Sequence, residues 1–237
     1  MTVSAELAEI DEWWARVTGS PGSPIAGSAA DQLTPDGTDN PYWELVRRLP
    51  AACGGPDGAV RGLPVGHHAL ATRYSWAIPS PGDIRWLAGI LGDLALFEVG
   101  AGSGYWAWQA RQAGIDVIAY EPSAPGDNGF NDGVEYVRTL RAGVAAAALH
   151  PDRALLLCWP SHGDPWAAQA LESYTGDLIV YIGEGRGGRC ADEGFFDLLG
   201  RHWVAIGSSP HHVTWRHADC TMTAYRRSVV PRQDDGG

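Results

Sequence analysis

LALFEVGAGSGYWAWQARQAGIDVIAYEP, residues 94–122, is the stretch that decides the fold of this chain. Leu94 to Val99 is a short apolar run of the kind that forms a buried parallel strand. Three glycines at alternate positions over residues 100–104 predict a tight turn that a ligand can approach closely. Tyr105 to Gln112 is predicted to be a helix, and Ile115 to Tyr120 a second strand. Such a strand, turn, helix and strand bind a nucleotide-like ligand at the carboxyl ends of the strands.

The spacing of the glycines distinguishes this turn from a dinucleotide-binding turn. The dinucleotide fingerprint is G-x-G-x-x-G, and Tyr105 occupies the position of its third glycine. An acidic residue, Glu98, lies two positions before the first glycine, and a second one, Glu121, lies 17 positions after the last. The pattern E-V-G-A-G-S-G with a later acidic residue resembles motif I and the second-strand acidic residue of class I S-adenosylmethionine-dependent methyltransferases.

This resemblance implies S-adenosylmethionine as the cofactor. It implies that the glycine turn lies against the amino-acid part of the cofactor and that Glu121 accepts hydrogen bonds from both ribose hydroxyls. A carboxylate suits that role because it only accepts hydrogen bonds and can take two donors at once. The cofactor-binding residues expected on this basis are Glu98, Gly100, Ala101, Gly102, Gly104, Glu121, Pro122 and Trp159. The alternative is a Rossmann-like unit that binds another ligand or none.

Strands and helices alternate along the chain, which predicts an α/β fold. The resemblance implies a Rossmann-like, seven-stranded, doubly wound sheet of order 3-2-1-4-5-7-6, with strand 7 antiparallel and an N-terminal helical appendage. The expected strands are Leu94–Val99, Ile115–Tyr120, Val134–Leu140, Ala154–Cys158, Leu178–Ile182, His202–Gly207 and Cys220–Tyr225.

Three regions are expected. Residues 1–72 form the N-terminal helical and loop appendage, residues 73–227 the S-adenosylmethionine-binding catalytic domain, and residues 228–237 a flexible tail. Within the appendage, Ala5 to Val17 carries apolar residues at helical spacing and predicts an amphipathic helix. Packing on the domain is its expected role; a cap over the site and a homodimer contact are the alternatives.

Composition limits the classes of function. The formal charge of −11 argues against nucleic-acid substrates, which require a basic surface. All 17 basic residues are arginine, so chemistry that needs a lysine Schiff base is excluded. No apolar window of about 20 residues and no signal-peptide pattern occur, so a cytoplasmic protein without a membrane span is expected. The four cysteines are scattered, and the pattern of His211, His212 and His217 lacks the partners of a metal site, so no metal is expected.

Candidate acceptor-binding and catalytic residues lie on both sides of the glycine turn. The stretch RYSWAIP at residues 73–79, followed by VGAGSGYWAW at residues 99–108, resembles a group of largely uncharacterised methyltransferase-like proteins, and the resemblance extends from about Arg73 to Arg227. After the fourth expected strand, amino-group methyltransferases often have Asp or Asn followed by Pro-Pro-Tyr, whereas this chain has Trp159-Pro160-Ser161-His162. A tryptophan cannot accept a proton, so a direct copy of the nitrogen-methylating site is not expected. His162 is the candidate base, because histidine is the usual proton acceptor near neutral pH and this one follows the fourth expected strand. The candidate catalytic residues are His162, Trp159 and Tyr105, and the candidate substrate-binding residues are Tyr74, Trp76, Trp106 and Glu184.

The expected function is methyl transfer from S-adenosylmethionine to a small-molecule acceptor, with a role in secondary metabolism. One alternative is an enzyme of the same fold that cyclises S-adenosylmethionine itself to azetidine-2-carboxylate and releases methylthioadenosine. The other is a non-catalytic module that binds S-adenosylmethionine.

Overall fold

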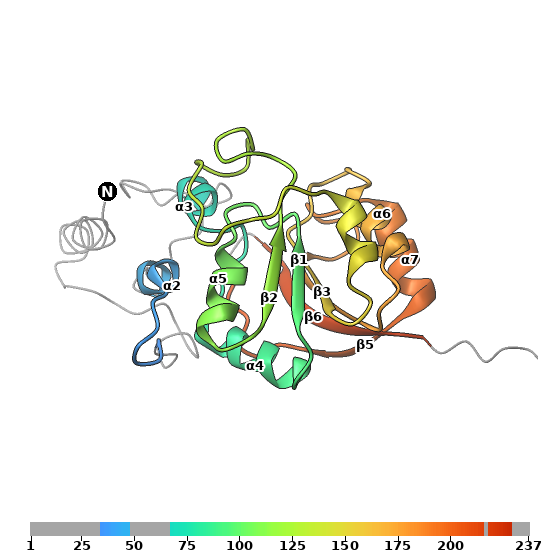
Figure 1. The fold of residues 1–237 in the computed structure, drawn as a ribbon, viewed down its shortest axis with the longest axis horizontal. Coiled ribbons are helices and arrows are strands. Elements are labelled where there is room, and N and C mark those ends of the chain that lie inside the picture. Colours follow the sequence, from blue (N-terminus) through green and yellow to red (C-terminus); the bar gives the residue numbers. More distant parts are fainter. Residues whose placement is uncertain (1–33, 48–66, 216–217, 229–237) are drawn as a thin grey trace, which may run out of the picture.

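A mixed six-stranded sheet with helices on both faces forms the centre of the computed structural model, which describes residues 34–47, 67–215 and 218–228 (Figure 1). The strands are β1 (Leu96–Val99), β2 (Val117–Tyr120), β3 (Ala154–Cys158), β4 (Leu178–Glu184), β5 (Trp203–Ser208) and β6 (Cys220–Arg227). Their order is β2-β1-β3-β4-β6-β5. Strands β1 to β4 pair in parallel, and β6 pairs antiparallel with both β4 and β5. The predicted α/β class is confirmed, with six described strands.

The predicted strand over Val134–Leu140 is wrong, and the seven-stranded count is wrong with it for the described residues. Only Leu140 bridges β2, through Tyr120. The rest of the segment turns toward the glycine turn instead: the N–H of Tyr136 donates to the carbonyl of Ser103 at 2.9 Å. The Tyr136 ring also stacks on Trp108, with centroids 5.3 Å apart. The segment therefore packs over the turn and the following helix rather than extending the sheet.

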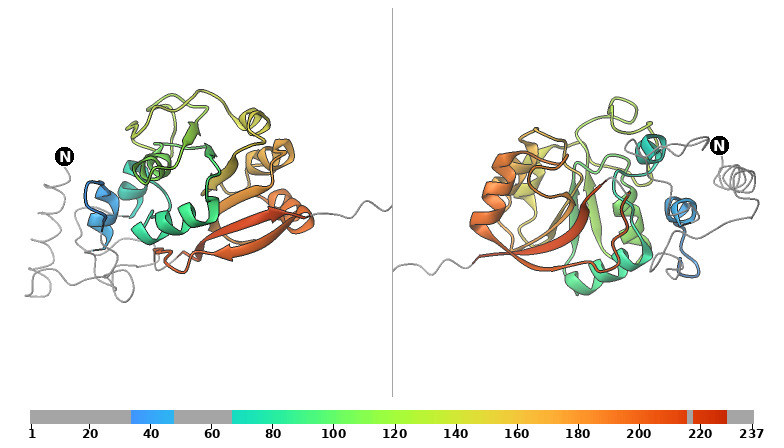
Figure 2. Two further views of the ribbon diagram at one scale, coloured as in Figure 1. Left: turned by 60° about the horizontal axis from the view of Figure 1, so that its bottom comes forward. Right: turned by 180° about the vertical axis from the view of Figure 1, so that it is seen from behind.

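The helices are α2 (Pro41–Val46), α3 (His67–Arg73), α4 (Pro81–Leu91), α5 (Tyr105–Gln112), α6 (Trp166–Ser173) and α7 (Glu193–His202), with a 3-10 helix η2 (Val144–Leu149). Five helical segments form two layers on the sheet, with α4 and α5 on one face and α6, α7 and η2 on the other, while α2 and α3 lie beside α5 (Figures 1 and 2). Side chains alternate between the faces along each strand. Leu96 of β1 packs with α4 and α5, whereas Phe97 packs with α6, α7 and η2. The two resulting apolar clusters fix the sheet and so the edge where its parallel strands end.

A third buried cluster joins α2 to the start of α5. Tyr42 and Trp43 of α2 are fully buried together with Tyr74 and Tyr105. Asn40 caps α2 by accepting a hydrogen bond from the Trp43 N–H at 3.1 Å. The amphipathic helix predicted over residues 5–17 lies outside the described residues, as does the tail after residue 228.

In the part of the chain that the structure describes, no helix has both the length and the apolar character needed to cross a membrane.

Candidate functional site

One cavity of about 730 Å³ lies where the parallel strands end. This volume falls within the range of about 300–1,000 Å³ that is usual for small-molecule sites. Its lining includes residues that follow each of β1, β2, β3 and β4. They are Gly100, Ala101 and Gly102 after β1, Glu121 and Pro122 after β2, Trp159 and His162 after β3, and Arg189 after β4. Ligands of open α/β sheets bind at this edge, so the cavity is the candidate site.

The glycine turn between β1 and α5 gives the cavity its floor. Gly102 has a φ of +55°, and a Cβ atom built there would meet no atom within 4 Å. The space beside Gly102 is thus open to a ligand. Gly104, by contrast, has a φ of +72°, and a Cβ atom there would lie 2.6 Å from Cγ2 of Val137. Gly104 does not line the cavity, and its small size serves the packing of the segment that crosses the turn.

The carboxylate of Glu121 holds the glycine turn against the end of β2. Its Oε2 accepts a hydrogen bond from the Gly102 N–H at 2.9 Å, and its Oε1 accepts one from the Ser123 N–H at 3.0 Å. The side chain is nearly buried and lines the cavity. Because a carboxylate has about four acceptor positions, Glu121 can accept further hydrogen bonds from a ligand.

Glu98, the third residue of β1, is buried with one oxygen unsatisfied. Its Oε2 has no hydrogen-bond partner, although the residue lines the cavity. Burial raises the pKa of Glu98 to about 8; the Ala107 N–H bond opposes this rise and the nearby charge of Glu121 adds to it. The carboxyl group therefore holds a proton at neutral pH until a cationic group approaches it.

Aromatic side chains also line the cavity. The rings of Trp76 and Trp159 have centroids 6.5 Å apart and planes inclined by 25°. The Nε1–H of Trp76 donates to the carbonyl of Phe130 at 3.0 Å. Trp159 has a φ of +50°, which is unusual for a bulky side chain. Its N–H donates to the carbonyl of Ile182 at 2.7 Å, so the end of β3 is fixed to β4.

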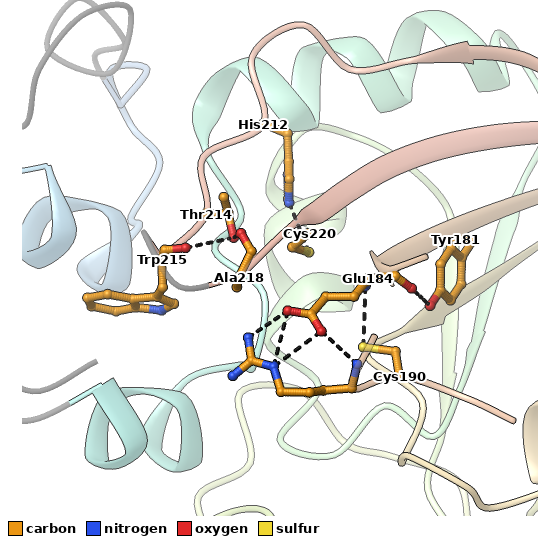
Figure 3. A network of polar contacts seen from close by, with 9 residues as sticks. Tyr181, Glu184, Cys190, His212, Thr214, Trp215, Ala218 and Cys220 are labelled. Atoms are coloured by element: carbon orange, nitrogen blue, oxygen red, sulfur yellow. Dashed lines mark hydrogen bonds and ion pairs between the residues drawn. The ribbon is translucent and has the colours of Figure 1, made fainter. Parts of the chain in front are cut away.

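Arg189 is a cavity residue that the sequence analysis did not identify. It pairs with Glu184 at the end of β4: the Arg189 N–H donates to Oε2 at 2.6 Å, and Nη2 donates to Oε1 at 2.6 Å (Figure 3). The Arg189 guanidinium holds the pKa of the Glu184 carboxyl below its usual value. The glycines of residues 183–188 predict a turn after β4, but they do not indicate that Arg189 pairs with Glu184 or lines the cavity.

Four of the predicted site residues do not line this cavity: Tyr105, Trp106, Gly104 and Glu184. The hydroxyl of buried Tyr105 donates to Asn40 at 2.9 Å and accepts from the Tyr42 N–H at 2.9 Å. Buried Trp106 donates to the carbonyl of Ala77 at 3.2 Å. Their polar groups are thus used to anchor neighbouring segments, and Glu184 reaches the cavity only through Arg189.

The remaining predicted residues do line the cavity. They are Glu98, Gly100, Ala101, Gly102, Glu121, Pro122, Tyr74, Trp76, Trp159 and His162. His162 is exposed, and its ring makes no hydrogen bond with a residue in the described ranges. It is thus placed to meet a group that enters from solvent.

A second polar cluster lies outside the cavity lining. His212 forms hydrogen bonds with Asp83 at 2.9 Å and with Sγ of Cys220 at 3.3 Å (Figure 3 shows the latter). The hydroxyl of Ser209 donates to the other Asp83 oxygen at 2.6 Å. Burial raises the pKa of the Cys220 thiol well above its ordinary value, so the thiol stays protonated. These contacts join the start of α4 to the loop between β5 and β6.

The sequence matches no protein-family model and none of the curated proteins. Solved structures with detectable similarity include the 1,6-didemethyltoxoflavin N1-methyltransferase of Burkholderia thailandensis, with 19% identity over 62% of this chain and 77% of that chain and a TM-score of 0.42. Magnesium protoporphyrin IX methyltransferase of Synechocystis PCC 6803 has 11% identity over 94% of this chain and 97% of that chain, with a TM-score of 0.44. The glycopeptide N-methyltransferase MtfA has 13% identity over 62% and 89% of the two chains, with a TM-score of 0.43. At this level of similarity, these proteins do not assign a substrate to this chain.

Proposed function

We propose that this chain transfers a methyl group from S-adenosylmethionine to a small-molecule acceptor. The observation that carries the proposal is the cavity beside Gly102, with Glu98 and Glu121 at the ends of adjacent strands. The motif I resemblance of the glycine turn supports it. The acidic overall charge agrees with a small-molecule acceptor rather than a nucleic acid.

The residues of the cavity fit the cofactor at two independent points. Glu121 has acceptor positions beyond those used by the Gly102 and Ser123 N–H groups, and these suit the two ribose hydroxyls. The unsatisfied Oε2 of Glu98 suits the ammonium group of the amino-acid part. A buried polar atom without a partner is rare in folded proteins, and a ligand that supplies the partner accounts for it.

The remaining requirements of methyl transfer fall on the residues after β3. S-adenosylmethionine supplies a methyl group that its sulfonium already activates. A bond forms between the acceptor atom and the methyl carbon, while the carbon–sulfur bond breaks and its electron pair stays on sulfur. The chain must hold the acceptor in line and exclude water, which we assign to Trp76 and Trp159. Where the acceptor atom carries a proton, an imidazole nitrogen of His162 takes it.

Titration calorimetry with S-adenosylmethionine and S-adenosylhomocysteine tests the proposal. Both are expected to bind at one per chain. Glu121→Gln should weaken binding at least tenfold, since a charge-assisted hydrogen bond contributes about 1.5–3 kcal/mol. Glu193→Gln is the matched control, because Glu193 is an exposed acid in α7 that does not line the cavity. Equal affinity of the wild-type protein and Glu121→Gln would contradict the proposed site.

The product formed distinguishes methyl transfer from the alternatives. Incubation with S-adenosylmethionine and a panel of acceptors should release S-adenosylhomocysteine, measured by mass spectrometry. Rapid release of methylthioadenosine without an acceptor would instead support self-cyclisation. Stoichiometric binding without turnover over the whole panel would support a non-catalytic module.

A further inference from the structure

The order of the strands divides the cavity into two ends. Strands β2 and β1 carry Glu121 and the glycine turn, which belong to the proposed cofactor site. Strands β3 and β4 follow on the other side of β1, and their ends carry Trp159 and Arg189. A second substrate that meets the cofactor must therefore lie against the residues of the β3–β4 end.

That end of the cavity is lined by aromatic rings. Trp76 and Trp159 line it with planes inclined by only 25°. Phe130, 57% exposed, adds a third ring that meets Trp76 edge-on at a centroid distance of 6.3 Å. Aromatic rings bind other rings by offset stacking or edge contacts. These walls thus favour a ligand that is itself planar.

The two tryptophans are held in place before any ligand arrives. Trp76 is fixed by its hydrogen bond to the Phe130 carbonyl and by an edge contact with His68, with centroids 5.4 Å apart. Trp159 is fixed by its backbone, because its N–H is bonded to Ile182 and its φ is positive. Strain of this kind persists where the surrounding structure over-determines a residue, and it gathers at ligand sites.

Arg189 gives this end of the cavity a cationic group in a fixed orientation. Its guanidinium lies over the ring of Trp159, 5.9 Å from the ring centre, which is a cation–π contact. Buried Glu184 holds the guanidinium through Nε and Nη2, with contacts of 2.6 to 3.2 Å. The Arg189 side chain is still 49% exposed. A guanidinium that is positioned and open to the cavity suits a ligand oxygen that accepts hydrogen bonds.

We infer that the acceptor is a planar aromatic molecule with an anionic oxygen substituent, whose ring lies against Trp76 and Trp159 and whose oxygen binds Arg189. This inference rests on the proposed function, because it assigns the β3–β4 end of the same cavity to the acceptor. In this role Glu184 is a positioning residue that acts through Arg189.

Three probes with matched features test the inference in the presence of saturating S-adenosylhomocysteine. They are 2-naphthoate, 2-naphthylmethylammonium, which reverses the charge, and decalin-2-carboxylate, which keeps the charge but is not planar. Calorimetry is expected to give at least tenfold tighter binding for 2-naphthoate than for either of the others. Trp76→Leu should weaken 2-naphthoate at least tenfold, and Arg189→Gln should remove its advantage over the ammonium probe.

Two controls separate this inference from the proposed function. Trp86→Leu changes a partly buried tryptophan of α4 outside the cavity lining and should leave the affinity for 2-naphthoate unchanged. Affinity for S-adenosylhomocysteine reports whether Trp76→Leu and Arg189→Gln are folded. Suppose that S-adenosylhomocysteine binds to the wild-type protein. If 2-naphthoate then does not bind, or binds to Trp76→Leu as tightly as to the wild-type protein, the acceptor class is wrong while the proposed function stands. If S-adenosylhomocysteine itself does not bind to the wild-type protein, the proposed function fails and the acceptor class fails with it.

Discussion

Replacing Glu98 with glutamine should change how the stability of the protein depends on pH. The carboxyl pKa in the folded chain is about 8, against an ordinary value of 4.5. As pH rises above about 4.5, Glu98 of the unfolded chain loses its proton, while Glu98 of the folded chain keeps it until about pH 8. The unfolded state then binds fewer protons, so the free energy of unfolding falls with rising pH over this window.

The size of the effect follows from the width of the window. One pKa unit corresponds to about 1.4 kcal/mol, so the wild-type protein should lose roughly 3 kcal/mol from this group between pH 5 and pH 7.5. Glu98→Gln has no proton to lose and should lack this decline. Its fixed effect on packing is the same at both pH values and cancels when the two proteins are compared across pH.

Urea unfolding of both proteins at pH 5, 6, 7 and 7.5 measures this difference. The free energy of unfolding of the variant, relative to the wild-type protein, should rise steadily over the series. Parallel curves would refute the reasoning, because they would mean that Glu98 titrates at its ordinary pKa in the folded chain.

The same carboxyl group should release a proton when the proposed cofactor binds. An ammonium group next to Oε2 favours the carboxylate, so binding at pH 6.5 is expected to release close to one proton. Calorimetry in two buffers with different ionisation enthalpies measures this number. The wild-type protein should show the buffer dependence and Glu98→Gln should not; equal heats for the wild-type protein in both buffers would contradict a cation at this position.

Three further predictions concern the glycine turn, the buried cluster at α4 and the charge of the chain. Gly104→Ala should lower the free energy of unfolding by about 2 kcal/mol, because the added Cβ meets Val137 at a positive φ; Gly102→Ala should lower it by only about 1 kcal/mol but should weaken S-adenosylmethionine at least tenfold. Gly114→Ala is the control for backbone strain alone, because Gly114 has a φ of +82° and open space around it. Equal affinity of Gly102→Ala and Gly114→Ala for S-adenosylmethionine would contradict the proposal that the cofactor lies against Gly102. Asp83→Ala should lower the free energy of unfolding by about 3 kcal/mol, because Ser209 and His212 lose a buried acceptor. The control Asp93→Ala, at an exposed position, should change it by less than about 0.5 kcal/mol. Similar urea midpoints for the two variants would show that the hydrogen bonds to Asp83 do not stabilise the fold. Neither DNA nor RNA is expected to bind tightly, because the chain is acidic. A titration that shows tight binding, weakened by added salt, would contradict this prediction.

The sequence predicted the elements whose residues carry strong local signals. Helix α5 has the predicted bounds, since the glycine turn starts it and Gly114 follows it. Strand β3 also has the predicted bounds, because its apolar run is short and bounded by turn residues. The strand predicted over Val134–Leu140 was wrong for a reason that no local pattern reveals. Tyr136 contacts Ser103 and Trp108, which are distant in sequence, and only Leu140 pairs with β2.

The candidate site shows the same contrast. The glycine turn, Glu98 and Glu121 belong to one continuous stretch, so their spacing in the sequence was enough to predict that they line one cavity. Tyr105 and Trp106 were predicted to be site residues because they follow that turn, but α5 directs both into buried contacts. Arg189 was missed because its place depends on the pairing with Glu184, and a sequence pattern does not indicate which arginine meets which carboxylate.

The backbone of Trp159 bears on how this protein could change under selection. A non-glycine residue at a φ of +50° costs about 1–2 kcal/mol relative to glycine. The ring nevertheless contacts all three apolar clusters and forms a wall of the cavity. Trp159→Gly would relieve this strain, but it would also remove the contacts of the ring with the three clusters, and the loss of a large packed side chain costs more than the strain. Selection for stability and selection for turnover are therefore both expected to keep a large aromatic side chain at position 159, in spite of its backbone strain.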